Sequence, residues 1–275
     1  MKRLTHEEIQ KRSLAILKDI DSFCRANDIR YFVTYGTLLG AVRHKGFVPW
    51  DDDIDIAMPR EDYDRFVKEY KSEDYEFIGL ENNPDVYITL GRVTDTKKSY
   101  MVSSVPWHGT SVKTGLFIDI FPMDHVPEDK ASRKKLYGSL RYLNTNSVRI
   151  RKAHVEILGD KKVLRSLFYR YFHPRLRLTD PTLLPRYVQY LVKTCSDPSS
   201  PLVSQFTYPD RKLWAFREDE LYDLIDLPFE DITVRAPKMY DRFLRSIYGN
   251  YMQLPPKEKQ HPTGQKFCSI FSTEE

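Results

Sequence analysis

Hydrophobic positions recur along the chain with two different periods, and each period predicts one kind of secondary structure. Apolar side chains recur every three or four residues over 6–26, and Thr5 with Glu8 gives the pattern of a helix capping box. Alternation with a period of two over 53–58 predicts a strand. By the same criteria we expect helices at 37–42 and 63–70 and further strands at 31–35, 75–80, 87–94, 99–105 and 116–121, the last ending at Pro122.

The pattern changes near residue 128, where strand-like segments give way to long helical ones. Helical spacing covers 128–156, 162–172 and 182–195, and a strand at 229–235 and a helix at 238–248 precede an extended tail. We therefore predict an α+β fold with a mixed sheet. Residues 1–127 would form an α/β core that carries the chemistry. Residues 128–275 would form a mostly helical region whose last strand and helix pack back on the core.

Composition narrows the class of protein. Hydrophobic residues make up 41% of the 275 residues and charged residues 30%, which excludes a disordered chain and allows a core without disulfides. No apolar run reaches the 18 or so residues of a membrane-spanning helix, and the first residues lack the apolar stretch of a signal peptide. The three cysteines lie far apart in the sequence. We expect a protein of the reducing cytoplasm.

Charge is distributed unevenly. The chain carries a net charge of +4, yet residues 131–177 alone carry +11. Around 161–171 basic residues flank an apolar helical face. We therefore expect the basic segment, residues 131–177, to contact the anionic inner surface of the cell membrane. The alternative is that this face packs on the core and the charges are solvated. No nucleic-acid-binding motif accompanies the charge, so nucleic acid is not an expected partner.

An acidic cluster is the most informative stretch of the sequence. Asp51, Asp52, Asp53 and Asp55 place four carboxylates within five residues, and such charges repel one another unless a cation or basic groups neutralise them. Oxygen ligands suit Mg²⁺, Mn²⁺ or Ca²⁺. On a strand, Asp53 and Asp55 point the same way and are predicted metal ligands. For Asp51 and Asp52, hydrogen bonding or fixing of the loop is an equal alternative. For the whole cluster, the alternative is a solvated turn.

A further carboxylate interrupts the apolar strand at 116–121. Asp119 lies between Ile118 and Ile120, where a charge is costly unless it is paired or bound to metal. If this strand neighbours the one that carries Asp55, Asp119 completes a three-carboxylate site suited to phosphoryl or nucleotidyl transfer. The alternative is a buried aspartate satisfied by an arginine or by backbone amides.

A turn with phosphate-binding character precedes the cluster. Gly36 and Thr37 end a predicted strand and open a short helix, 17 residues before Asp53. The glycine lets the backbone approach a ligand, and the helix amides with the Thr37 hydroxyl can hold a phosphate. The intervening loop supplies three candidates for diphosphate contacts, namely Arg43, His44 and Lys45. An ordinary turn and a solvated loop are the alternatives.

Four segments together resemble the signature of the LicD family. They are residues 34–44 (TYGTLLGAVRH), 46–55 (GFVPWDDDID) and 115–124 (GLFIDIFPMD), with a C-terminal motif at 248–256 (YGNYMQLPP). The resemblance implies a nucleotidyltransferase-type α/β core with a glycine turn, a two-carboxylate strand and a third carboxylate on a later strand. It assigns these parts to Gly36-Thr37, to Asp53 and Asp55, and to Asp119.

The resemblance also implies an activity. LicD proteins transfer phosphocholine from CDP-choline to teichoic acids or other surface glycans, and fukutin-related members transfer ribitol phosphate. We therefore expect a transferase that uses Mg²⁺ or Mn²⁺ and releases CMP, with Asp119 as a metal ligand or as the base. Its acceptor would be a lipid-linked teichoic-acid precursor. Choline binds to aromatic faces, so Trp50 and Trp107 are candidate donor-binding residues, with packing roles as the alternative.

Two other classes of protein share the acidic cluster. A true nucleotidyltransferase would use the same metal site and release pyrophosphate. A calcium-binding module would be stabilised by Ca²⁺ without turning over any nucleotide. The Gly36-Thr37 turn at its distance from Asp53 argues against the module.

Overall fold

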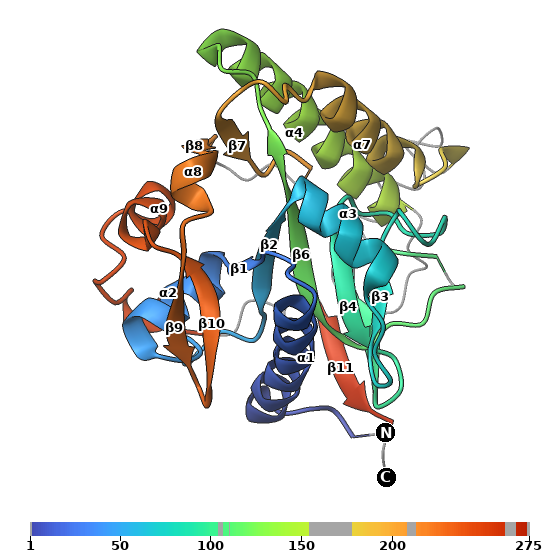
Figure 1. Ribbon diagram of the computed structural model, residues 1–275. Coiled ribbons are helices and arrows are strands. Elements are labelled where there is room, and N and C mark those ends of the chain that lie inside the picture. Colours follow the sequence, from blue (N-terminus) through green and yellow to red (C-terminus); the bar gives the residue numbers. More distant parts are fainter. Residues whose placement is uncertain are drawn as a thin grey trace.

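The structure, a computed structural model, describes residues 2–103, 107–109, 111–153, 178–207, 213–261 and 268–273. It has the α+β architecture expected from the sequence (Figure 1). The helices are α1 (His6–Ala26), α2 (Tyr35–His44), α3 (Arg60–Glu69), α4 (Lys130–Ala153), α7 (Leu183–Cys195), α8 (Glu218–Leu221), α9 (Tyr240–Tyr248) and a 3₁₀ turn, η1 (Lys257–Lys259).

The strands gather mainly in one mixed sheet. They are β1 (Phe32–Val33), β2 (Asp55–Pro59), β3 (Glu76–Ile78), β4 (Gly91–Asp95), β5 (Ser99–Ser103), β6 (Leu116–His125), β7 (Leu202–Ser204), β8 (Phe216–Arg217), β9 (Leu224–Phe229), β10 (Ile232–Pro237) and β11 (Cys268–Ser272). The main sheet has the order β1-β2-β6-β4-β3, with β7 and β8 continuing from the far end of β6. Only the β2–β6 pair in it is parallel. β6 pairs with β2, β4 and β7, so it is the central strand of the sheet.

The prediction that β6 ends at Pro122 is wrong, because the strand continues to His125. The Asp119 amide donates to Ile54 on the β2 side, so by alternation the position of Pro122 faces the other side. On that side β6 pairs with β4 only as far as Ile120, and its pairing with β7 begins at Asp124. Pro122 thus falls in the gap between two neighbours and removes no ladder hydrogen bond.

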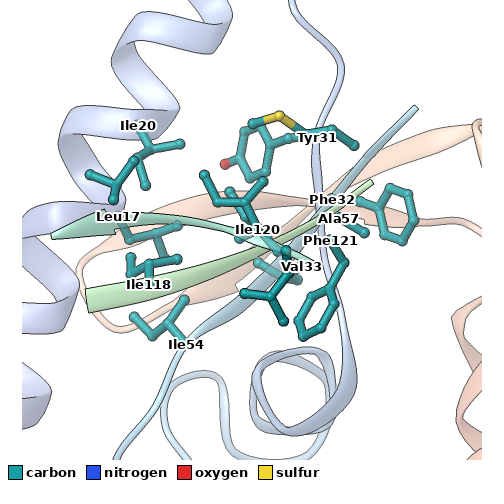
Figure 2. Close-up of a cluster of buried hydrophobic side chains, with 14 of the residues drawn as sticks. Leu17, Ile20, Tyr31, Phe32, Val33, Ile54, Ala57, Ile118, Ile120 and Phe121 are labelled. Carbon is teal, nitrogen blue, oxygen red and sulfur yellow. The ribbon is translucent and has the colours of Figure 1, made fainter. Parts of the chain in front are cut away.

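α1 covers one face of the sheet. The capping box expected at its start is present, with Thr5 and Glu8 bonded reciprocally. Leu17 and Ile20 are fully buried, as are Ile118 and Ile120 of β6, and Figure 2 shows these side chains facing one another. At about 1.5–3 kcal/mol for each large apolar side chain buried, this layer is a main source of stability.

The C-terminal half contains a second, smaller apolar cluster between α4 and α7, built from Tyr137, Leu140, Val188, Val192 and Phe206 with Val126. Strands from this half also return to the first: β11 pairs with β5, and residues of the β9–β10 hairpin pack into the main core. The division of the chain near residue 128 stays a prediction. The expected helix at 162–172 and the basic face at 161–171 lie outside the described residues.

Most predicted elements are confirmed, with shifted ends. The strand expected at 31–35 is only Phe32–Val33, because α2 already begins at Tyr35. The strand expected at 53–58 begins at Asp55. The strands β7, β8, β9 and β11 were not predicted; β7 and β8 have only three and two residues, too few to show a period. In the described part of the chain, no helix is both long and apolar enough to cross a membrane.

A buried ion pair ties the start of α3 to the end of β6. Arg60 Nε lies 2.7 Å from Asp124 Oδ1, Arg60 Nη2 lies 3.0 Å from Oδ2, and Asp124 is 3% exposed. Removing one partner leaves an uncompensated buried charge. We predict that Arg60→Gln lowers the free energy of unfolding in urea by about 3 kcal/mol. Arg217→Gln, which breaks an exposed pair with Asp219, should leave it nearly unchanged. Equal effects of the two substitutions would contradict the prediction.

Candidate functional site

The site begins at the tight junction between β1 and α2. Tyr35 has φ +47°, a left-handed conformation that costs a bulky residue about 1–3 kcal/mol. Its ring packs edge-on against Phe121, and its hydroxyl donates to Gln205. The Thr34 amide donates to the Asp55 carbonyl over 3.0 Å. Tertiary contacts therefore hold the strained turn against the start of β2.

Gly36 leaves room for the close approach of a carboxylate. A Cβ at this position would lie 2.3 Å from Asp51 Oδ2, which is far inside van der Waals contact. The Asp51 side chain thus packs against the first turn of α2, where the helix dipole favours negative charge. The place where the sequence predicted a phosphate is one that accepts an anion, and here a carboxylate of the cluster lies against it.

Thr37 joins α2 to β2. The Asp55 amide donates to Thr37 Oγ1 over 2.8 Å, and Thr37 is 4% exposed. This bond satisfies a backbone donor at the first residue of β2. Because a hydroxyl both accepts and donates, Thr37 still has its own proton to offer.

Asp55 and Asp119 are direct neighbours in the parallel pair of β2 and β6. Residues in register on adjacent strands lie about 4.8 Å apart and point to the same face. The condition set by the sequence for joining these two carboxylates, that their strands be neighbours, is met. Asp53 lies just before β2, in a segment without regular secondary structure that carries Asp51 and Asp52 as well.

The carboxylates raise one another's pKa. Burial, followed by the charges of Asp119 and Asp51, raises the pKa of Asp55 well above its usual value. Desolvation by the surrounding protein, followed by the charges of Asp55 and Asp51, does the same to the pKa of Asp53. Burial also raises the pKa of Asp51. The cluster therefore holds negative charge at a cost that a bound cation would relieve.

The chemistry of these donors fits a hard divalent cation. Asp51, Asp53 and Asp55 form no ion pair with a basic residue among those described. Oxygen donors of this kind suit Mg²⁺ or Mn²⁺. As the side chains stand, the described residues contain no group of three His, Cys, Asp or Glu arranged as a ligand set.

A basic residue that the sequence reasoning missed pairs with Asp119. Arg92 of β4 lies opposite Asp119 in the antiparallel register, and its Nε is 2.6 Å from Asp119 Oδ1. This is the arginine partner that the alternative explanation of Asp119 required. The signal was present in the sequence, because an arginine inside the apolar 87–94 segment demands a partner as much as an aspartate does.

Trp107 belongs to the same group of side chains. It is 4% exposed, and the Arg92 guanidinium carbon lies 4.2 Å from the centroid of its ring. A cation therefore already occupies the ring face that the sequence proposed for choline. The role of Trp107 in donor binding stays a prediction, and the contact observed is one with Arg92.

The remaining predicted residues lie at the end of α2 and in the loop that follows it, at the opposite end of the helix from Gly36 and Thr37. Arg43 Nη1 donates to the Tyr251 carbonyl over 2.6 Å, and its Nε to His44 Nε2 over 2.9 Å. Both partners are uncharged acceptors, so the positive charge of Arg43 is available to an anion. The rings of His44 and Trp50 lie 6.4 Å apart, edge to face. Lys45 caps α2 in a left-handed conformation and its side chain is exposed.

Comparison with protein families places this geometry in context. Residues 28–156 match the family model described as LicD/FKTN/FKRP, nucleotidyltransferase domain. The matched segment contains α2, β2 and β6, and with them the acidic cluster, Asp119 and Arg92.

Similarity to individual proteins extends further. The chain is 30% identical over 266 residues to the lipopolysaccharide cholinephosphotransferase LicD of Haemophilus influenzae, covering 95% of this chain and 97% of that protein. An uncharacterized protein of Rickettsia typhi is 38% identical over 88 residues, which is 30% of this chain and 27% of that protein. One of Rickettsia prowazekii is 49% identical over 47 residues, or 17% and 18% of the two chains.

The Thr37 hydroxyl can be tested without any substrate. Thr37→Val keeps the shape of the side chain and leaves the half-buried Asp55 amide without its acceptor, so we predict a loss of about 1–3 kcal/mol in the free energy of unfolding. Thr34→Val is the matched control, because Thr34 is equally buried and its side chain makes no capping bond. Urea denaturation measures both. Equal losses for the two variants would show that the bond contributes nothing specific.

Proposed function

The chain belongs to the LicD family, and on this premise we propose that it transfers phosphocholine from CDP-choline to a sugar hydroxyl of a surface-glycan precursor, releasing CMP. The observation that carries the proposal is the placement of Asp55 beside Asp119 across β2 and β6, next to the turn at Gly36 and Thr37. Similarity over nearly the full length to a lipopolysaccharide cholinephosphotransferase supports the choice of phosphocholine. We propose an acceptor of the lipopolysaccharide or teichoic-acid kind.

A divalent metal ion, Mg²⁺ or Mn²⁺, is part of the proposal. Asp53 and Asp55 would hold it, because the pKa of each is raised and neither forms an ion pair with a basic residue among those described, and Asp119 would be a third ligand or the base. When bound, the ion would neutralise the charge of the donor diphosphate.

The residues of the chain suggest a division of labour. The first turn of α2 would hold the phosphate oxygens through its amides and the Thr37 hydroxyl. Arg43 would add a charge-assisted contact, since its present partners are neutral. The acceptor hydroxyl would attack the phosphorus that bears choline, CMP would leave, and Asp119 would receive the hydroxyl proton if it acts as the base.

Choline recognition is assigned to Trp50 rather than to Trp107. A quaternary ammonium needs an open aromatic face, and the ring of Trp107 is buried beneath Arg92. Trp50 is half-buried and directly precedes Asp51, so it lies at the edge of the acidic cluster.

Phosphorus NMR tests the donor directly. The protein with Mg²⁺ and a lipopolysaccharide or short teichoic-acid acceptor should release CMP from CDP-choline and form a new phosphodiester. CDP-ribitol and CTP are run in parallel. CMP formed only from CDP-ribitol would identify a ribitol-phosphate transferase, and pyrophosphate from CTP would identify a nucleotidyltransferase. Stabilisation by Ca²⁺ with no turnover of any donor on either acceptor would favour the calcium-binding module. Each of these results would overturn the proposal.

The metal-binding role predicts the effect of one substitution. Asp53→Asn removes a carboxylate from the pair and should reduce turnover of CDP-choline to below about a tenth of the wild-type rate. Asp74→Asn is the matched control, because this exposed aspartate lies 3.8 Å from Lys98 and takes no part in the cluster. Retention of more than about a tenth of the activity by Asp53→Asn would exclude the role.

A membrane surface is proposed as the place where the acceptor is met. α4 and α7 together carry ten Lys and Arg residues and no Asp or Glu, and they pack side by side at one end of the molecule (Figure 1). Their buried sides form the smaller apolar cluster. Their outer sides expose Tyr142, Leu183, Tyr187 and Tyr190 at 47–68%. Basic residues with exposed aromatic side chains favour the interface of an anionic bilayer.

Co-sedimentation with vesicles tests this surface independently of the reaction. The protein should bind vesicles of phosphatidylcholine with phosphatidylglycerol at low salt and not vesicles of phosphatidylcholine alone. Lys134→Gln/Lys135→Gln should weaken binding by about 2 kcal/mol, or roughly 30-fold. Lys68→Gln/Lys71→Gln removes the same charge from another exposed site and should have little effect. Equal weakening by the two pairs would show a response to net charge only.

A further inference from the structure

We propose that Arg92 is a positioning residue that holds Asp119 in the orientation needed for the transfer reaction. The inference rests on the proposed function, because it gives Asp119 a part in that reaction. Arg92, Asp119 and Asp55 stand in register on β4, β6 and β2, so they form one row across three neighbouring strands. In this row the guanidinium of Arg92 lies next to Asp119, the carboxylate on the middle strand.

The guanidinium group of Arg92 is itself fixed by two aromatic rings. Its central carbon lies 3.8 Å from the centroid of Phe117 and 4.2 Å from that of Trp107. The two ring centroids are 6.1 Å apart at an angle of 63°, and the Arg92 side chain is 12% exposed. A planar guanidinium stacks on aromatic faces, and an ammonium group cannot reproduce that packing. Trp107 therefore acts on the site through Arg92.

The contact between Arg92 and Asp119 uses only one oxygen. Arg92 Nε donates to Oδ1, and Nη1 is buried without a hydrogen-bond partner among the described residues. Asp119 Oδ2 is thus left uncommitted by the arginine. The Arg60–Asp124 pair, on the same strand five residues further along, engages both carboxylate oxygens.

This contrast separates a structural pair from a positioning one. A two-point arginine–carboxylate pair is the stronger arrangement, and it leaves no oxygen for another partner. The one-point pair gives up part of that strength and keeps a buried donor unsatisfied, which destabilises the fold. What it retains is a carboxylate with a fixed orientation and one oxygen available to a metal ion or to the acceptor hydroxyl.

Steady-state kinetics with CDP-choline tests the inference. Arg92→Gln should lower kcat by about 10–100-fold while the KM for CDP-choline stays nearly unchanged, since the contact supports a group and does not bind the donor. Arg92→Lys keeps the charge and should recover part of the loss. Arg60→Gln is the matched control, assayed where circular dichroism shows it folded. It removes an arginine from a buried pair on the same strand and should leave kcat unchanged.

Two results would overturn the inference. A raised KM with unchanged kcat in Arg92→Gln would make Arg92 a donor-binding residue, and an equal loss of kcat in Arg60→Gln would show a general loss of rigidity. A double-mutant cycle in urea with Arg92→Gln and Asp119→Asn needs no substrate. Coupling between the two changes is expected even if CDP-choline is not the donor, whereas additive effects would show that the pair does not act as a unit.

Discussion

Negative charge gathers where β2 and β6 run side by side, and the surrounding structure is arranged to tolerate it. Asp51 packs against the first turn of α2, where the missing Cβ of Gly36 leaves room for its carboxylate. Thr37 fixes the start of β2, and Arg92 neutralises Asp119. Asp53 and Asp55 form no ion pair with a basic residue in the described part of the chain. The fold therefore concentrates its uncompensated charge at one place, which is what a site for a cation and a diphosphate requires.

The buried layers supply the rigidity that this arrangement needs. α1 packs across β6 on one face of the sheet, and the ring of Tyr35 packs against Phe121 at the strained turn. Like charges held close together separate unless the backbone beneath them is over-determined. Here the parallel register of β2 and β6 sets the distance between Asp55 and Asp119, and the hydrophobic core sets the register. The geometry of the site therefore depends on the stability of the hydrophobic core.

The predictability of the site from sequence follows the range of the interactions involved. Asp53 and Asp55 can be recognised from the neighbouring aspartates in the sequence, and Asp119 from its position between two isoleucines. Arg92 was missed because its importance comes from the neighbour it meets across β4 and β6, and periodicity holds no information on strand order. The end of β6 was mispredicted at Pro122 for the same reason. A proline breaks a strand only where its nitrogen faces a neighbour that needs a donor, and the nitrogen of Pro122 faces the gap between β4 and β7.

The tryptophans show how burial changes the meaning of a residue type. In the sequence, Trp50 and Trp107 are equivalent aromatic candidates near the carboxylates. In the fold, Trp50 remains partly accessible, whereas Trp107 is buried and its face is covered by a guanidinium. Cation–π attraction is thus present at Trp107, but its cation comes from the protein. The attraction that would bind a choline headgroup here holds the Arg92 guanidinium in place. Through the contacts Trp107–Arg92 and Arg92–Asp119, an aromatic side chain thus supports the acidic site without contacting a ligand.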